Sequence, residues 1–119
     1  MDAWIHPSTE WPVPNSSESG AAIQNFPFEG PGIIRVVIKA GKEVARHFHQ
    51  YSHSFVYVAE GEGTIFLNGK EHLVKPGDVI YYPPKHIHGF KAGKKDLILL
   101  AVENPPNTRP DGTRDTFFV

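Results

Sequence analysis

Two histidines stand one residue apart in the stretch "HFHQYSHS", residues 47–54, and a third follows at His53. Side chains alternate along a β-strand, so His47 and His49 are expected on one face with Phe48 on the other. Two neutral imidazoles on one strand face are suitable adjacent ligands for a divalent ion such as Zn, Fe, Cu or Ni. The alternative is a pair of surface histidines on a half-exposed strand. The spacing, with further histidines in the chain, favours the metal site.

A third ligand has to come from another part of the chain. The stretch "PPKHIHGF" supplies His86 and His88, again two residues apart. A fold of short strands can bring this stretch against residues 47–53. His86 follows two prolines and is expected at the rim of the fold. His72 is expected to be exposed, and His6 is expected to be incidental.

The elements that must position these histidines are short β-type runs separated by turn residues. The runs expected to form strands are 33–39, 45–49, 54–60, the two arms around Asn68-Gly69, 79–82, 86–90, 96–102 and the last four residues. An Asn-Gly pair is a strong hairpin signal because both turn positions tolerate positive φ. About eight short strands predict an all-β fold, a small jelly-roll β-barrel or sandwich. We expect an extended N-terminal arm over 1–20 and a single barrel domain over 21–119.

Composition excludes several classes of function. The 119 residues suit one domain, the formal net charge is −1, and no basic block indicates nucleic-acid binding. There is no cysteine, which excludes disulfides and thiolate ligands. The N-terminus lacks the pattern of a signal peptide, and the longest apolar run, residues 97–102, is too short to span a membrane. These features favour a cytoplasmic protein that binds neither nucleic acid nor membrane.

Two motifs in this chain resemble those of the cupin superfamily. The first cupin motif, G-x5-H-x-H-x(3,4)-E-x6-G, is similar to the segment that runs from Gly41 through His47 and His49 to Gly61. The second, G-x5-P-x-G-x2-H-x3-N, is similar to residues 77–92, which include His88. The resemblance covers roughly residues 33–102. It implies a jelly-roll barrel, or double-stranded β-helix, that binds a divalent metal through His47, His49 and His88.

The chain departs from the cupin pattern at three places. Lys85 replaces the glycine of the second motif, and Ala92 stands where asparagine is usual. The motif glutamate is absent: its place is Ser54 by the spacing to Gly61, or His53 by the spacing to His49. This loss matters most, because it changes the charge at the metal.

Two kinds of cupin offer precedents for a missing glutamate. Some small cupins carry H-x-H-x3-H and use four histidines, often on manganese, which would make His53 the fourth ligand. Thiol dioxygenases use three histidines on Fe(II), and their H-x-H-x-x-S-H stretch resembles "HFHQYSHS", which would place Ser54 toward the metal. Both alternatives stay open at this point. A three-histidine set is neutral, so the metal would keep its full double charge and attract an anionic substrate.

Cupin pockets are lined by alternate strand residues. The candidates for the substrate pocket are Arg35, Ser54, Tyr57, Phe66, Tyr81 and Phe90. The aromatic residues among them are equally compatible with a core role. Arg35 interrupts an apolar run, so its guanidinium lies either on the outer face or inside, paired with an anion.

The resemblance and the residues together predict a metal-dependent enzyme that acts on a small polar or anionic metabolite. An oxygen-using, dioxygenase-like reaction with Fe(II) is the leading interpretation. One alternative is an isomerase or lyase with Mn, Ni or Zn as a Lewis acid, and another is a small-ligand binding or sensing module that is not a catalyst. An exposed β edge favours aggregation unless it is covered. Because the aromatic N-terminal arm and the "TFFV" end could cover such an edge between subunits, we also predict a homodimer.

Overall fold

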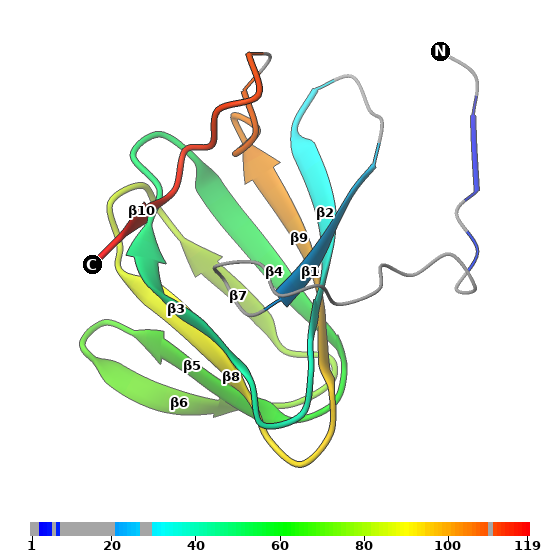
Figure 1. Ribbon diagram of the computed structural model, residues 1–119, viewed down its shortest axis with the longest axis vertical. Coiled ribbons are helices and arrows are strands. Elements are labelled where there is room, and N and C mark those ends of the chain that lie inside the picture. The colour runs from blue at the N-terminus through cyan, green and yellow to red at the C-terminus, as the bar shows by residue number, and fades with distance from the viewer. Residues whose placement is uncertain (1–2, 6, 8–20, 27–29, 110) are drawn as a thin grey trace.

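The computed structural model describes residues 3–5, 7, 21–26, 30–109 and 111–119 of the chain. In these residues the protein is all-β, as predicted, with two antiparallel five-stranded sheets that lie face to face (Figure 1). The strands are β1 (Ala21–Phe26), β2 (Gly32–Ile38), β3 (Glu43–Phe48), β4 (His53–Glu60), β5 (Gly63–Leu67), β6 (Lys70–Val74), β7 (Val79–Tyr82), β8 (His88–Ala92), β9 (Leu97–Asn104) and β10 (Phe117–Phe118).

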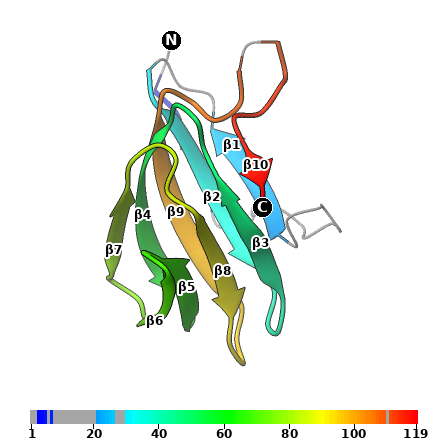
Figure 2. The ribbon, with the colours of Figure 1, turned by 90° about the vertical axis from the view of Figure 1, so that its left-hand side faces the viewer.

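The first sheet has the strand order β1-β2-β9-β4-β7, and the second has the order β10-β3-β8-β5-β6. Apart from the consecutive pairs β1-β2 and β5-β6, neighbours in each sheet are far apart in the chain, which is the arrangement of a jelly roll. No ladder of backbone hydrogen bonds joins the two sheets among the described strands, so the expected barrel is an open two-layer sandwich (Figure 2). The sheets turn their inner faces toward each other, and the space between them holds the core.

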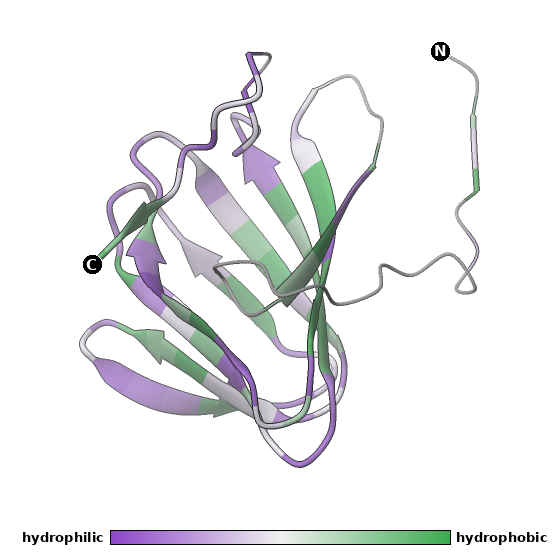
Figure 3. Ribbon diagram, viewed as in Figure 1, coloured by the Kyte–Doolittle hydropathy of each residue, from purple (hydrophilic) through white to green (hydrophobic). Residues whose placement is uncertain are grey.

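The core follows from the two-residue period of the strands. In β4, the side chains of Ser54, Val56 and Val58 are buried, whereas the alternate residues are exposed. Whole strands also differ in hydropathy. In Figure 3, β2 and β9 are largely hydrophobic, whereas β6 is largely hydrophilic. Most of the apolar run in β9 is buried, but Leu100 is 38% exposed.

Two turn residues of the cupin-like motifs have left-handed backbone conformations. Gly61 has φ of +86°, and a Cβ there would overlap the carbonyl of Asp96, so the turn after β4 requires glycine. Lys85 precedes β8 with φ of +73°, a left-handed conformation that explains why glycine is usual at this motif position. The Lys85 N–H donates to the carbonyl of His49 at 2.7 Å. This bond ties the second motif to the end of the first.

The C-terminal segment crosses from one sheet to the other. After β9 the chain runs over one end of the sandwich, and β10 then pairs with β3 at the edge of the second sheet (Figure 1). The ring of Phe117 stacks on that of Phe48, with 5.5 Å between their centroids. The "TFFV" end is therefore docked within the domain. Of the expected N-terminal arm, residues 1–2, 6 and 8–20 lie outside the described residues, while the Trp4 ring stacks on Phe26. No helix among the described residues is long and apolar enough to cross a membrane.

Candidate metal centre

Three histidines from the second sheet converge on its inner face. His47 lies in β3 directly opposite His88 of β8 in the strand pairing, and His49 follows β3 on the same face as His47. The side chains of all three are buried, and His88 is only 1% exposed. Their ring centroids lie 4.2 to 5.2 Å apart, and one potential ligand nitrogen from each ring lies within 4.8 Å of the others. The spacing predicted from the sequence thus produces a compact imidazole cluster.

Hydrogen bonds fix the orientation of each imidazole ring. The Nδ1 atoms of His47, His49 and His88 lie 2.7, 2.6 and 3.0 Å from the carbonyl oxygens of Ala45, Asp115 and His86. A carbonyl only accepts, so each Nδ1 carries the proton and donates it. Each Nε2 is then unprotonated and has a lone pair that a metal ion can accept. A carbonyl contact of this kind on the distal nitrogen is the usual support of a metal-binding histidine.

The electrostatics of the cluster keep the rings neutral. Burial lowers the pKa of His47 to about 4, even though its bond to the Ala45 carbonyl acts in the opposite direction. Burial, together with the charge that His47 would carry, lowers the pKa of His88 to about 2. Burial also lowers the pKa of His49, against the effect of the Asp115 carbonyl and carboxylate. Neutral imidazole is the form that a metal requires, so no proton has to be displaced at neutral pH.

One atom of the cluster has an unmet requirement that a metal would satisfy. Nε2 of His88 is buried and has no hydrogen-bond partner among the described residues. Leaving a buried polar atom unsatisfied is costly, and such an atom calls for an explanation such as an absent ion. Three buried imidazoles with unprotonated Nε2 atoms are a donor set for Zn, Fe, Ni or Mn. The residues present therefore fit a divalent transition metal.

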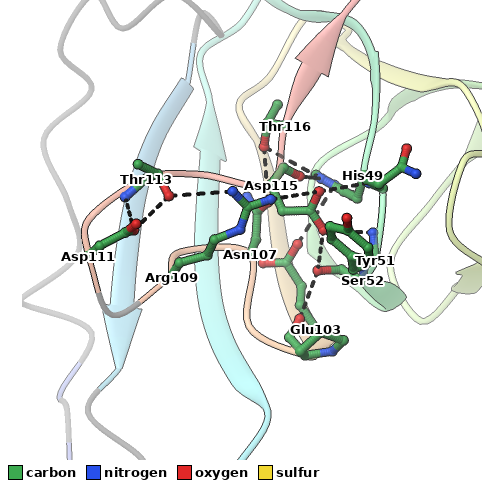
Figure 4. A network of polar contacts seen from close by, with 12 residues as sticks. His49, Tyr51, Ser52, Glu103, Asn107, Arg109, Asp111, Thr113, Asp115 and Thr116 are labelled. Atoms are coloured by element: carbon green, nitrogen blue, oxygen red, sulfur yellow. Dashed lines mark hydrogen bonds and ion pairs between the residues drawn. The ribbon is translucent and has the colours of Figure 1, made fainter.

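The C-terminal segment supports His49 from outside the two motifs (Figure 4). While the Asp115 carbonyl accepts from the His49 ring, the Asp115 carboxylate accepts from the backbone N–H groups of Gln50, Tyr51 and Ser52 at 2.8 to 3.1 Å. Burial would raise the pKa of Asp115, but these N–H bonds outweigh it and the pKa lies below its ordinary value. Asp115 thus remains a carboxylate that fixes the chain immediately after His49.

A second carboxylate lies beside the cluster on the first sheet. Glu103 of β9 is 4% exposed, and its Oε2 lies 3.7 Å from Nε2 of His49 (Figure 4). Burial raises the pKa of Glu103 to about 7, although the nearby Arg114 guanidinium acts to lower it. The inner face therefore carries an ionisable carboxyl next to the imidazole cluster.

The cluster forms one wall of a cavity of about 390 Å³ between the sheets. Apolar side chains form much of the remaining lining: Ala21, Ile23, Ile34, Val36, Val44, Val56, Phe90, Leu99, Ala101 and Phe118. The polar side chains on the cavity, besides the histidines, are Tyr82, Glu103, Asn107, Arg114 and Thr116. The Tyr82 ring stacks on His88 with 3.9 Å between centroids, and burial raises the pKa of its hydroxyl, which stays protonated. An apolar cavity with a few convergent polar groups is the usual form of a small-ligand site.

Comparison with known proteins agrees with this geometry. The family model described as "Cupin domain" matches residues 34–103, which is more than half of the chain. The chain belongs to the cupin family. The resemblance seen in the motifs is thereby confirmed, and the open jelly-roll sandwich is the cupin fold of this chain.

Three cupin relatives bear on the site. The uncharacterised protein MJ1618 of Methanocaldococcus jannaschii is 31% identical over 66% of this chain and 64% of its own length. Quercetin 2,3-dioxygenase of Bacillus subtilis is 29% identical over 55% of this chain and 19% of its own length. The solved structure of a predicted oxalate decarboxylase from Thermotoga maritima has a TM-score of 0.74 and 25% identity, and it covers 84% of this chain and 97% of its own. The chain thus spans less than two thirds of the length of both curated relatives.

The structure separates the two residues that compete for the place of the cupin glutamate. His53 is exposed at the start of β4, its Nδ1 lies 2.8 Å from the Tyr81 hydroxyl, and it is not part of the histidine cluster. Ser54 is fully buried, on the inner face of β4. The alternation of the strand makes this separation unavoidable, because two consecutive residues face opposite sides. In this cupin, the residue that faces the core at the glutamate place is Ser54.

The other residues predicted for the cupin pocket divide in the same way. Phe90 lies on the wall of the cavity, whereas Arg35, Tyr57, Phe66 and Tyr81 do not line it. Arg35 lies between two cavity residues of β2, so it faces outward, where it donates to Gln24 at 3.3 Å. Tyr57 and Tyr81 are 47% and 44% exposed. The Phe66 ring lies under the Arg46 guanidinium, 3.7 Å from its centroid.

Several polar residues of the cavity were not predicted from the sequence. Glu103, Asn107, Arg114 and Thr116 lie at the end of β9 or in the segment after it, beyond the cupin motifs. One signal was present, because Glu103 is an acid that directly follows the apolar run "LILLAV". Nothing local marks the other three, since their place depends on the path of the C-terminal segment over the cavity.

Proposed function

We propose that this cupin is a metal-dependent enzyme that acts on a small anionic metabolite, with O₂ as the second substrate. The observation that carries the proposal is the convergence of three buried, neutral imidazoles on the wall of one cavity. His47, His49 and His88 would hold the ion. A divalent metal bound there would supply Lewis acidity and, if it is Fe(II), a site for oxygen.

The chain itself provides the means to bind and orient an anionic substrate. Arg114 lines the cavity, and its positive charge acts on both Glu103 and His47. A guanidinium binds a carboxylate through two parallel hydrogen bonds, so Arg114 is the candidate anchor for the substrate's charged group. The apolar walls from β2, β4 and β9 would cover the rest of the molecule and exclude water from the reacting atoms.

The relatives support oxygen chemistry and one alternative. A curated relative is a quercetin 2,3-dioxygenase, which favours an oxygen-using reaction. The neighbouring structure of a predicted oxalate decarboxylase favours the second candidate, a lyase in which Mn, Ni or Zn acts as a Lewis acid on a small carboxylate. Both candidates use the same residues and the same class of anion. Consumption of O₂ distinguishes them, because only the first requires it.

The first test is the metal content of the purified protein. Wild type, His47→Ala and His53→Ala are expressed with Fe, Mn, Ni and Zn supplied, and metal is measured by plasma mass spectrometry. We expect about one ion per chain in wild type, loss in His47→Ala, and retention in His53→Ala, the matched control with an exposed ring. The metal-loaded protein is then assayed for O₂ uptake with small carboxylates. Absence of metal from wild type would overturn the proposal, and binding of a carboxylate without turnover would replace it with a binding module.

A homodimer and a cytoplasmic location remain predictions. Because the "TFFV" end is docked within the domain, support for a dimer shifts to the outer face of the first sheet. The large apolar side chains exposed on that face are Phe55, Tyr57, Val79, Tyr81 and Leu100. Exposed apolar patches of this kind often mark contacts between proteins.

A further inference from the structure

The missing cupin glutamate has a neighbour that can replace it. Ser54 occupies the glutamate place on β4, and its direct partner in the pairing with β9 is Glu103. We propose that Glu103 is the carboxylate ligand of the metal site, supplied by β9 instead of β4. This inference rests on the proposed function, since it assumes that the three histidines bind a metal.

The register of the first sheet makes the exchange geometrically simple. Residues directly opposite each other in antiparallel strands project to the same face, with Cβ atoms about 5 Å apart. Ser54 and Glu103 are such a pair, and both are buried on the inner face. The Glu103 carboxylate therefore projects from β9, the strand next to the one that carries the cupin glutamate place, toward the same histidine cluster. Ser54 is small enough to leave it room.

The contact with His49 points to a cation between the two groups. Nδ1 of His49 donates its proton to the Asp115 carbonyl, so Nε2 presents a lone pair toward Oε2 of Glu103 at 3.7 Å. Two electron donors facing each other repel unless something positive lies between them. Donor atoms that each lie about 2.1 Å from one ion are themselves about 3.0 to 4.2 Å apart. The separation from His49 falls in the range expected for two ligands of a single metal ion. The carboxylate lies outside the group that the three histidines form, so the Glu103 side chain would turn toward the ion on binding.

The charge balance supports the same assignment. A carboxylate that is 4% exposed needs a compensating charge, because an unpaired buried charge is very costly. Arg114 is the nearby cation in the described part of the chain, but it is an exposed residue at the cavity. A divalent ion on the cluster would compensate Glu103 and retain one positive charge. That remaining charge, with Arg114, suits the small anionic substrate proposed above.

The test compares metal binding in variants that remove or relocate the carboxylate. Glu103→Gln keeps the shape of the side chain and removes the charge, and Glu60→Gln is the matched control because Glu60 is an exposed acid on β4. The double variant Ser54→Glu/Glu103→Ser returns the carboxylate to the cupin motif position. Affinity for Co(II) is measured by calorimetry, and the ligand-field spectrum of bound Co(II) reports the donor set.

We expect Glu103→Gln to lower Co(II) affinity at least tenfold and to shift the spectrum, while Glu60→Gln changes neither. The double variant should recover most of the affinity. Thermal unfolding of the metal-free proteins checks that each variant folds. If Glu103→Gln does not fold, Glu103→Asp is used instead, because the shortened carboxylate should still shift the Co(II) spectrum.

The possible failures are distinguishable. A folded Glu103→Gln, or Glu103→Asp in its place, with wild-type affinity and an unchanged Co(II) spectrum would overturn the role of Glu103 alone. A lower affinity in Glu103→Gln that the double variant does not recover, with the spectrum unchanged, would also overturn it and make Glu103 a merely supporting residue. Wild-type Co(II) affinity in His47→Ala would instead overturn the metal site itself, and with it the proposed function.

Discussion

The three histidines of the cluster are supported in two different ways. His47 and His88 donate to carbonyls two residues earlier in their own segments, those of Ala45 and His86. His49 donates to the carbonyl of Asp115, which is 66 residues away in the chain. Two of the histidines are thus positioned by the motifs that contain them, and the third depends on a distant segment.

This difference shows how a small cupin can couple its candidate metal site to the rest of the fold. His47 and His88 face each other across a strand pair, so their positions follow once β3 and β8 have paired. His49 lies beyond the end of β3, where no ladder holds the backbone. Asp115 supplies that support, and the same segment brings Arg114 and Thr116 to the cavity. One segment therefore both lines the cavity and supports the third histidine of the cluster.

The largest expected effect comes from removing the distant support. In Asp115→Ala, the backbone N–H groups of residues 50–52 lose their acceptor, the first two part-buried and that of Ser52 buried. A buried donor left unsatisfied costs about 1 to 3 kcal/mol, and a part-buried one costs less. We expect the free energy of unfolding to fall by about 3 kcal/mol or more and metal affinity to fall with it. Chemical denaturation of the metal-free protein and calorimetry with Co(II) measure the two effects.

Asp111→Ala is the control for this prediction. Asp111 is an acid in the same segment, but its carboxylate accepts only from the exposed Thr113. Its replacement should leave metal affinity unchanged and alter stability far less. Equal losses in the two variants would show that the C-terminal segment acts as a general cover and does not specifically support His49.

The next prediction concerns His47, one of the two histidines that are supported within their own segments. It is a change in the unfolding free energy with pH. His47 has a pKa of about 4 in the fold and about 6.5 in the unfolded chain, so between these values the unfolded state binds more protons. The contribution of His47 to the unfolding free energy of the metal-free protein is therefore complete above pH 6.5 and is lost as pH falls toward 4. The loss from His47 amounts to about 3 kcal/mol. Unfolding free energies of wild type and His47→Gln, measured from pH 7.5 to 4.5, give the contribution of His47 together with its effect on the pKa of His88.

The pH dependence that Glu103 gives to the unfolding free energy has the opposite sign to that of His47. For this reason wild type has to be compared with His47→Gln. The pKa of Glu103 is about 7 in the fold, above the ordinary value, so acidification through this range favours the folded state. In wild type alone, the two contributions would partly cancel. A difference between wild type and His47→Gln that does not change with pH would show that His47 is not held in a desolvated, neutral state.

The sequence was informative where structure is local and silent where it is not. The alternation of β-strands placed His47 and His49 on one face, and most strand boundaries followed from turn residues such as Asn68-Gly69 and Gly61. The same rule could not choose a face for Arg35, because a strand with apolar residues on both sides has no marked inner face. Register between β4 and β9, which pairs Ser54 with Glu103, is a long-range property. For that reason the second carboxylate was not expected.

The smallest expected effect concerns Lys85, which links the two kinds of support. The Lys85 N–H donates to the carbonyl of His49. The Lys85 φ of +73° puts a residue that has a Cβ into the left-handed region of the backbone, three residues before His88. That conformation costs a non-glycine residue about 1 to 2 kcal/mol, while glycine costs about 0.5 to 1 kcal/mol in chain entropy. Lys85→Gly should therefore raise the free energy of unfolding by about 0.5 to 1 kcal/mol, seen as a higher denaturant midpoint at an unchanged m-value. Asn68→Gly should gain less, because asparagine tolerates the left-handed conformation that it adopts in its hairpin turn. A loss of stability in Lys85→Gly would mean that contacts of the lysine side chain outweigh the backbone strain, and that its departure from the cupin motif is itself stabilising.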